Sequence, residues 1–151
     1  MKIADVKWIK VNTLTDDRGS LSAIESGSII PFNIKRIFYM HHIVSGADRG
    51  GHAHLETDQF AIALHGSLKV RVSDGISSKA FLLNSPSWGI YLPKLTWTDL
   101  YDFSGDAVCL VLASTHYDRS KSLRTWEEYL KARNFKILPL PDRDAVEVRH
   151  P

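Results

Sequence analysis

The feature that most constrains the fold is a succession of short strand-like segments that fills the first three quarters of the chain. The segments are rich in β-branched and aromatic residues, and clusters of Gly, Asp, Ser and Pro separate them at spacings of roughly 8–12 residues. They cover residues 6–14, 21–25, 34–42, a stretch beginning at 52, 60–64, 67–73, 79–83, 88–92, 97–103 and 107–114. Many short strands at this spacing are typical of a β-sandwich or barrel.

Two of these segments carry a clear burial pattern. Residues 107–114 are almost continuously apolar, which predicts a strand covered on both faces and a buried, unreactive Cys109. Residues 34–42 alternate instead. Alternation predicts that the even-numbered side chains, among them Arg36, share one face and that the odd-numbered ones, among them Tyr39, share the other.

The pattern changes after residue 120. Leu123, Trp126, Tyr129 and Leu130 recur at helical spacing, which predicts one amphipathic helix within residues 120–134, with Ser122 as a candidate N-cap. Residues 136–151 contain three prolines and mixed charges, and we expect an extended or partly disordered tail. The sequence thus predicts one domain over residues 1–135, all-β with a C-terminal α-helix, followed by a tail at 136–151.

Composition excludes several classes of function. The net charge is +2 and the basic residues are scattered, which argues against a nucleic-acid partner. No run reaches the roughly 18 apolar residues of a membrane span, so we expect no membrane partner. The first ten residues lack the apolar core of a secretory signal, and the single cysteine rules out an internal disulfide. These features predict a cytoplasmic protein.

The stretch RGGHAHLETDQFAIALHG, residues 49–66, carries the strongest chemical signal. His52 and His54 are separated by one residue, so both rings project from the same face of a strand. Paired imidazoles inside an enclosure allow either proton transfer or metal binding.

The spacing of Gly46, His52, His54, Gln59 and Gly66 matches the first motif of the cupins, so the chain resembles this family of jelly-roll (double-stranded β-helix) barrels. In that motif the two histidines and a glutamate bind a divalent metal, but here the glutamate position carries Gln59. In the second motif Leu95 and Thr98 stand at the glycine and histidine positions. A transition metal needs three or four good donors, so we expect no metal and no cofactor.

A longer series of segments points to a narrower group. DDRGSLSAIE, IPFNIKRIFYM, RGGHAHLETDQ, LHGSLKVRVSDG, WGIYLP, YDF and VLASTHYD occur in this order. Over about residues 8–134 the chain resembles the cupin 3,4-ketoisomerases of nucleotide-linked 4-keto-6-deoxyhexoses. The resemblance implies a metal-free homodimer that converts dTDP-4-keto-6-deoxyglucose into its 3-keto isomer. That product would supply aminotransferases that make 3-amino-3,6-dideoxysugars for surface polysaccharides.

The resemblance also implies roles for individual residues. His54 would be the base at C3, and His52 would manage the C4 side. Arg18 would face the sugar, and the remaining candidates for substrate binding are Arg36, Tyr39, Arg49, Gln59, Tyr91, Trp97 and Thr98. Arg36 and Arg49 suit the pyrophosphate, Gln59 suits a hydrogen bond near His54, and Trp97 suits a wall of the cavity. Thr98 replaces a larger basic or imidazole group, which leaves the C4 configuration of the product (gluco or galacto) open.

Three other functions fit parts of this pattern. A cupin could bind a nucleotide sugar without turnover, although a pure binder needs no paired imidazoles. A metal-dependent cupin could use His52, His54 and waters. A 3,5-epimerase acting on the same substrate would exchange protons at C3 and C5 and leave the ketone at C4.

Overall fold

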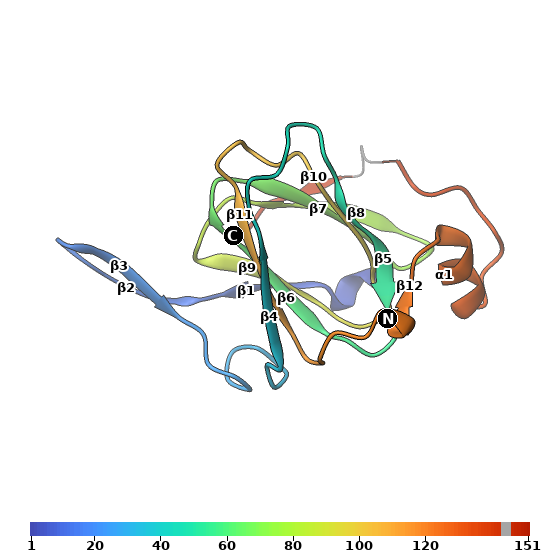
Figure 1. Cartoon of the computed structure of the whole chain (residues 1–151), viewed down its shortest axis with the longest axis horizontal. Coiled ribbons are helices and arrows are strands. Elements are labelled where there is room, and N and C mark those ends of the chain that lie inside the picture. Colours follow the sequence, from blue (N-terminus) through green and yellow to red (C-terminus); the bar gives the residue numbers. More distant parts are fainter. Residues whose placement is uncertain (143–145) are drawn as a thin grey trace.

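The computed structural model describes residues 1–142 and 146–151. Most of its β-strands form two sheets that face each other and make up a barrel (Figure 1). The five-stranded sheet has the order β1 (Lys7–Lys10), β9 (Trp88–Leu92), β6 (Gln59–His65), β11 (Val108–Ala113), β4 (Arg36–Met40). The six-stranded sheet has the order β12 (Ser122–Leu123), β5 (Arg49–His54), β10 (Trp97–Tyr101), β7 (Leu68–Ser73), β8 (Ser78–Leu83), β13 (Glu147–Val148). The predicted all-β fold is confirmed.

Two apolar layers stabilise this arrangement. Between the sheets, inward side chains such as Val70, Ile90 and Val111 form the main core. On the outer face of the five-stranded sheet, Phe60 packs against Phe32 from the segment that connects β3 to β4. Because β11 lies between these layers, both of its faces are covered, and Cys109 is fully buried. Burial raises the pKa of the Cys109 thiol to about 12, so it stays protonated and unreactive.

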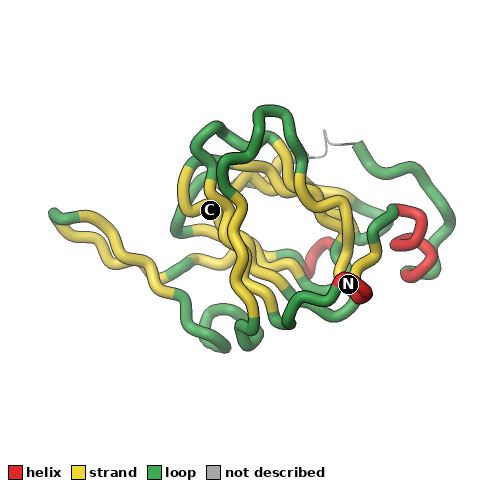
Figure 2. The backbone as a smooth tube through the Cα atoms, viewed as in Figure 1, coloured by secondary structure: helices red, strands yellow, loops and turns green. Residues whose placement is uncertain are grey.

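The predicted first strand, residues 6–14, is instead two strands with different partners. Val11 separates them: it is buried, and its N–H donates to the Ser87 carbonyl at 2.8 Å. After this residue the chain leaves the barrel, and β2 (Asn12–Asp16) pairs with β3 (Gly19–Ala23) in a hairpin. Figure 2 shows the hairpin as a pair of strands that projects away from the barrel.

Other predicted boundaries differ at their ends. The predicted strand at 34–42 is only Arg36–Met40, and His42 lies beyond it with a φ of 53°. The predicted strand at 97–103 ends at Tyr101, and Asp102 has a φ of 50°. A positive φ is incompatible with an extended strand, so both ladders stop before these residues.

The helix is shorter than predicted. α1 spans Trp126–Ala132, and its N-cap is Thr125, not Ser122. The Thr125 side chain accepts from the Glu128 backbone, and the Glu128 side chain accepts from the Thr125 backbone, which together form a capping box. Two short 3-10 helices, η1 (Ile3–Asp5) and η2 (Arg119–Lys121), complete the helical elements that the structure describes.

The last described residues of the C-terminal segment contact the barrel. β13 pairs in parallel with β8, and Val148 packs against the main core. His150 stacks on Trp88, with ring centroids 5.8 Å apart. Residues 143–145, within the predicted tail, lie outside the described residues. Among the described helices, none is long and apolar enough to cross a membrane.

Candidate active site

Strand β5 carries both imidazoles into the barrel. His52 and His54 lie on its inner face, with ring centroids 4.8 Å apart and planes at 84°. Ala53, between them, is fully buried on the opposite face beside Trp97. The period of two along a strand therefore places the two rings together, as predicted.

A β-bulge sets the position of His52. Thr98 of β10 pairs with His52, but the next residue, Asp99, pairs with Gly50, so Gly51 is the extra residue. Gly50 and Gly51 have φ values of 84° and 75°. A Cβ on Gly50 would lie 2.7 Å from the Thr98 carbonyl oxygen, so only glycine fits.

A cavity of about 330 Å³ opens beside the two rings. Gln59 and Thr98 contribute polar groups to its wall, and Arg49 and Tyr39 border it as exposed residues. The rest of the lining is mainly apolar: Phe38, Met40, Ala61, Leu92, Leu100 and Val111. A largely apolar cavity of this size with a few convergent polar groups is the usual form of a small-molecule site.

His54 is half-buried and has a polar neighbour at each ring nitrogen. The Gln59 amide nitrogen lies 3.3 Å from Nε2, and the Ser122 hydroxyl lies 3.5 Å from Nδ1. Burial, above all, lowers the pKa of His54 to about 4, and the charges of His52, Arg36 and Arg124 act in the same direction. The ring is therefore neutral at pH 7 and can accept a proton.

The pKa of His52 is also below its ordinary value. Burial is the main cause, and the charge of Arg124 adds to it. A hydrogen bond to the Gly50 backbone and the charge of Asp99 oppose the decrease. At pH 7 the site thus holds two neutral imidazoles in contact.

A second cavity, of about 320 Å³, meets the first at His54. Arg36 lines it together with Tyr117, Lys121 and Ser122. The Arg36 guanidinium lies over the rings of Phe38 and Tyr117, at 5.3 and 5.4 Å from their centroids. Its Nε atom is buried and has no hydrogen-bond partner among the described residues.

Three predicted site residues lie elsewhere in this chain. Arg18 is at the tip of the β2–β3 hairpin, 86% exposed and paired with Asp16 at 2.6 Å, because the chain leaves the barrel after Val11. Tyr91 faces the outer layer near Phe32, since its neighbour Leu92 points into the cavity.

Trp97 is the third of these residues. It is buried against Trp126 and Tyr129 on the outer face of β10, so the prediction that it forms a wall of the cavity is wrong. Thr98 faces inward, and adjacent strand residues point to opposite sides.

Ser122 is a site residue that the sequence did not reveal. It was the candidate helix cap, but it lies in β12 and pairs with His54 across the ladder. The sequence does contain a signal for this: the capping-box pattern Thr125-x-x-Glu128 predicts a helix that begins after Thr125, so Ser122 is not needed as the N-cap.

The donor set beside the histidines suits a metal poorly. Among the described residues, no three His, Cys, Asp or Glu side chains form a group that could hold a metal ion. Gln59 and Thr98 stand next to the imidazoles and offer only neutral donors, which hold transition metals weakly. The residues present favour acid–base chemistry by the imidazoles themselves.

Two facing sheets that enclose an apolar cavity with paired imidazoles place this chain among the cupin-type β-barrels. The model of the family described as WxcM-like, C-terminal (FdtA) matches residues 4–134. The chain therefore belongs to this family, which confirms the resemblance inferred from the sequence.

Similar proteins share both sequence and structure with this chain. The TDP-4-oxo-6-deoxy-alpha-D-glucose-3,4-oxoisomerase of Aneurinibacillus thermoaerophilus is 38% identical over 125 residues, which cover 83% of this chain and 90% of that protein. The sugar 3,4-ketoisomerase QdtA of Thermoanaerobacterium thermosaccharolyticum, in complex with TDP, is 36% identical with a TM-score of 0.85, covering 87% of this chain and 96% of that one.

Two further solved structures, one similar in sequence and one similar in fold only, show how far the similarity extends. A histidine-to-asparagine mutant of the same QdtA, in complex with TDP-4-keto-6-deoxyglucose, is 35% identical with a TM-score of 0.84, covering 86% and 94% of the two chains. The RmlC epimerase of Mycobacterium tuberculosis is 16% identical with a TM-score of 0.68, covering 81% of this chain and 69% of that one. The epimerase shares the fold alone.

Proposed function

We propose that this chain is a TDP-sugar 3,4-ketoisomerase that moves the ketone of a TDP-4-keto-6-deoxyhexose from C4 to C3. The observation that carries the proposal is the pair of neutral imidazoles in a cavity of about 330 Å³. Family membership and the names of the relatives support the same reaction.

The reaction needs proton transfer only. The hydrogen on C3 is acidic because its loss gives an enediolate whose negative charge is delocalised onto the C4 oxygen. A base removes that proton, and the C4 oxygen is protonated as the C3–C4 double bond forms. A proton then adds to C4 and the 3-hydroxyl loses its own proton, which leaves a ketone at C3. Because the ketone and the hydroxyl group exchange places within one molecule, the reaction needs no redox partner.

His54 is the proposed base at C3. It is neutral at pH 7 because its pKa is about 4, and its contacts with Gln59 and Ser122 hold the ring in place. His52, 4.8 Å away between centroids, is the proposed group that manages protons on the C4 side. A pair of adjacent imidazoles matches a reaction at two adjacent carbons.

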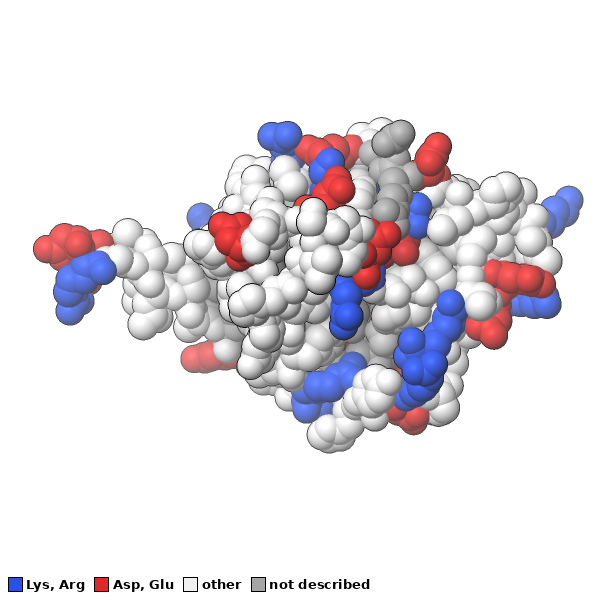
Figure 3. Space-filling view, turned by 45° about the horizontal axis from the view of Figure 1, so that its top comes forward, with Lys and Arg blue, Asp and Glu red and all other residues white. Residues whose placement is uncertain are grey.

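The diphosphate is assigned to the two arginines beside the cavities. Arg36, whose buried Nε lacks a partner, borders the second cavity, and Arg49 borders the first at its open side. Tyr39, an exposed residue of the edge strand β4, also borders the first cavity. On the face shown in Figure 3, several Lys and Arg side chains lie near the lower centre among mostly uncharged residues, with a few acidic side chains nearby.

Incubation with TDP-4-keto-6-deoxyglucose in D₂O tests the reaction. We expect a ketone at C3 and deuterium at C4 by NMR, and the configuration at C4 shows whether the small, neutral Thr98 gives the gluco or the galacto product. Deuterium at C3 and C5 with the ketone retained at C4 would identify an epimerase instead. No exchange at any carbon would leave a binding protein.

The proposal includes a homodimer. Leu14 and Leu21 pair across the hairpin and are 74% and 62% exposed. Strand β4 is an unpaired edge whose outer side chains Ile37 and Tyr39 are 60% and 63% exposed. Apolar hairpins and open edges are commonly covered by a partner chain. If the hairpin reaches the cavity of a second copy, Arg18 can still face the sugar, as the resemblance implies.

Light scattering is expected to give twice the chain mass of 17.0 kDa. Leu21→Glu places a charge on the exposed hairpin and should shift the protein toward one chain mass. Ile76→Glu is the matched control, because Ile76 is 76% exposed in the turn between β7 and β8, outside the hairpin and β4. A Leu21→Glu variant that keeps the doubled mass would contradict this dimer.

The wider setting follows from the chemistry. A 3-keto sugar is the substrate class that an aminotransferase converts into a 3-amino-3,6-dideoxysugar, and we place the enzyme before such a step in surface-polysaccharide synthesis. Nucleotide sugars are cytoplasmic intermediates, and a buried free thiol at Cys109 suits that compartment.

A further inference from the structure

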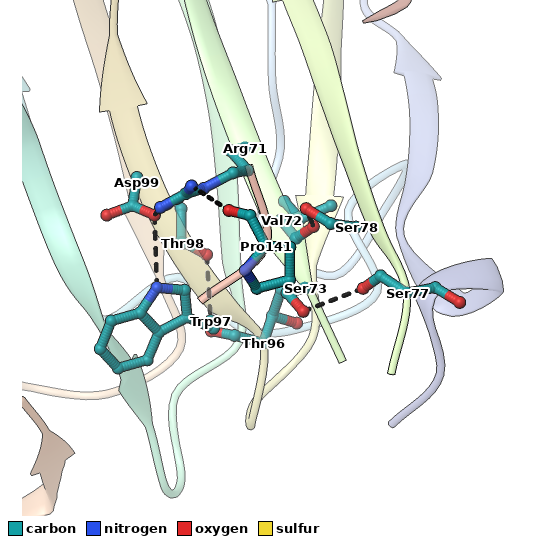
Figure 4. Close-up of polar contacts among 10 residues, drawn as sticks. All are labelled: Arg71, Val72, Ser73, Ser77, Ser78, Thr96, Trp97, Thr98, Asp99 and Pro141. Atoms are coloured by element: carbon teal, nitrogen blue, oxygen red, sulfur yellow. Dashed lines mark hydrogen bonds and ion pairs between the residues drawn. The ribbon is translucent and has the colours of Figure 1, made fainter. Parts of the chain in front are cut away.

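A buried ion pair lies on the outer face of the six-stranded sheet, directly behind the wall that carries Thr98. Arg71 of β7 stands opposite Asp99 of β10, and their side chains are only 4% and 11% exposed. Arg71 Nε donates to Asp99 Oδ2 at 2.9 Å, and Nη2 donates to the same oxygen. Trp97 Nε1 donates to it at 3.3 Å (Figure 4).

The C-terminal segment completes this cluster. Arg71 Nη1 donates to the carbonyl oxygen of Pro141 at 2.6 Å (Figure 4). The family model ends its match at residue 134, so this last contact comes from a segment beyond the matched region. Because two buried charges are costly unless their hydrogen bonds are satisfied, the extra acceptor stabilises the pair.

The pair is located where it can control the bulge. Asp99 is the residue that pairs with Gly50 after the shift in register, and its Oδ1 lies 3.6 Å from the place of a Cβ on Gly51. His52 follows Gly51 directly. The Asp99 carboxylate thus packs against Gly51 from the outer face of β5, while His52, the next residue, points into the cavity on the inner face.

We propose that Asp99, held by Arg71, is a positioning residue that fixes the Gly50–Gly51 bulge and so orients His52. The inference rests on the proposed function of His52. Asp99 lies on the outer face of the sheet and is not among the residues that line the cavity. Bulges next to active sites commonly re-aim a side chain in this way, and a displacement of about 1 Å can cost about 100-fold in rate.

The charges around His52 support the same role. Asp99 acts from β10 to raise the pKa of His52, against burial, whereas Arg124 acts from the segment before α1 to lower it. His54 is the titratable neighbour on β5 itself. Removing the carboxylate should therefore lower the pKa of His52.

The test uses the double variant Arg71→Met/Asp99→Leu in the full chain. It removes both charges at similar volume, which commonly preserves folding. We expect a folded protein whose kcat falls about 10- to 100-fold with KM unchanged, and whose His52 ring titrates at lower pH by NMR. Arg71→Lys keeps a cation beside Asp99 but loses the planar fork, so a smaller loss of kcat is expected, and this variant serves if the double variant does not fold.

The matched control is Lys69→Met/Glu147→Leu. This pair, at 3.2 Å, also joins β7 to the C-terminal segment but lies away from the bulge. The proposal would be overturned if the folded double variant, or Arg71→Lys in its place, kept the wild-type kcat and the wild-type pKa of His52. An equal loss of kcat in the control variant would also overturn it. Absence of isomerisation by the wild type would overturn the proposed function, while the His52 titration would still decide the positioning role.

Discussion

Replacing His54 by asparagine is expected to lower turnover by about 10²- to 10⁴-fold, the usual contribution of a well-placed acid–base group. The amide is close in size to the imidazole and can keep polar contact with Gln59 and Ser122, so the barrel should fold normally. It cannot accept the C3 proton at neutral pH. The measurement is the rate of ketone appearance at C3 by NMR, alongside a thermal melt of the same sample.

His65→Asn is the matched control for this prediction. His65 ends β6 at the opposite end of the strand from Gln59 and pairs with Asp106 at 3.3 Å on the surface. We expect wild-type turnover from this variant. Near wild-type turnover in His54→Asn itself would reject His54 as the base, even if the isomerisation were confirmed.

The second large effect is a loss of stability in acid. The pKa of His54 is about 4 in the folded chain and about 6.5 when unfolded, so the unfolded state binds more protons between these values. The contribution of His54 to the free energy of unfolding is therefore fully present above pH 6.5 and is lost as the pH falls toward 4. A shift of this size corresponds to at most about 3 kcal/mol of unfolding free energy. His52, whose pKa is also lowered, acts in the same direction.

Urea unfolding at several pH values between 4 and 7 measures this dependence. The free energy of unfolding should rise with pH in the wild type and rise less steeply in His54→Asn, which has no group to protonate at that position. Equal slopes in wild type and His54→Asn would show that His54 is not the buried group that loses its proton on folding.

Much of the site follows from local periodicity. The His52-x-His54 spacing places both rings on one face, and the regular geometry of a strand is enough to predict this. The contact of Gln59 with His54, which the resemblance implied, joins strands of two different sheets. The continuous apolar run around Cys109 likewise predicts a central strand.

The same rule corrects one prediction. Trp97 and Thr98 were both assigned to the cavity, yet neighbours on a strand face opposite sides. Alternation along β10 therefore allows only one of them inside, and the tertiary structure selects Thr98 because Trp97 packs under α1. Tyr91 and Leu92 divide in the same way on β9.

The sequence by itself determined the paired imidazoles, the all-β architecture with one helix and the family. Only the tertiary structure decided that Arg18 leaves the barrel on a hairpin, that Ser122 meets His54, and that Pro141 completes the Arg71–Asp99 pair. These last contacts join residues 68 and 70 positions apart. Periodicity acts within one strand, whereas register and packing between strands depend on the whole fold, so no local pattern encodes them.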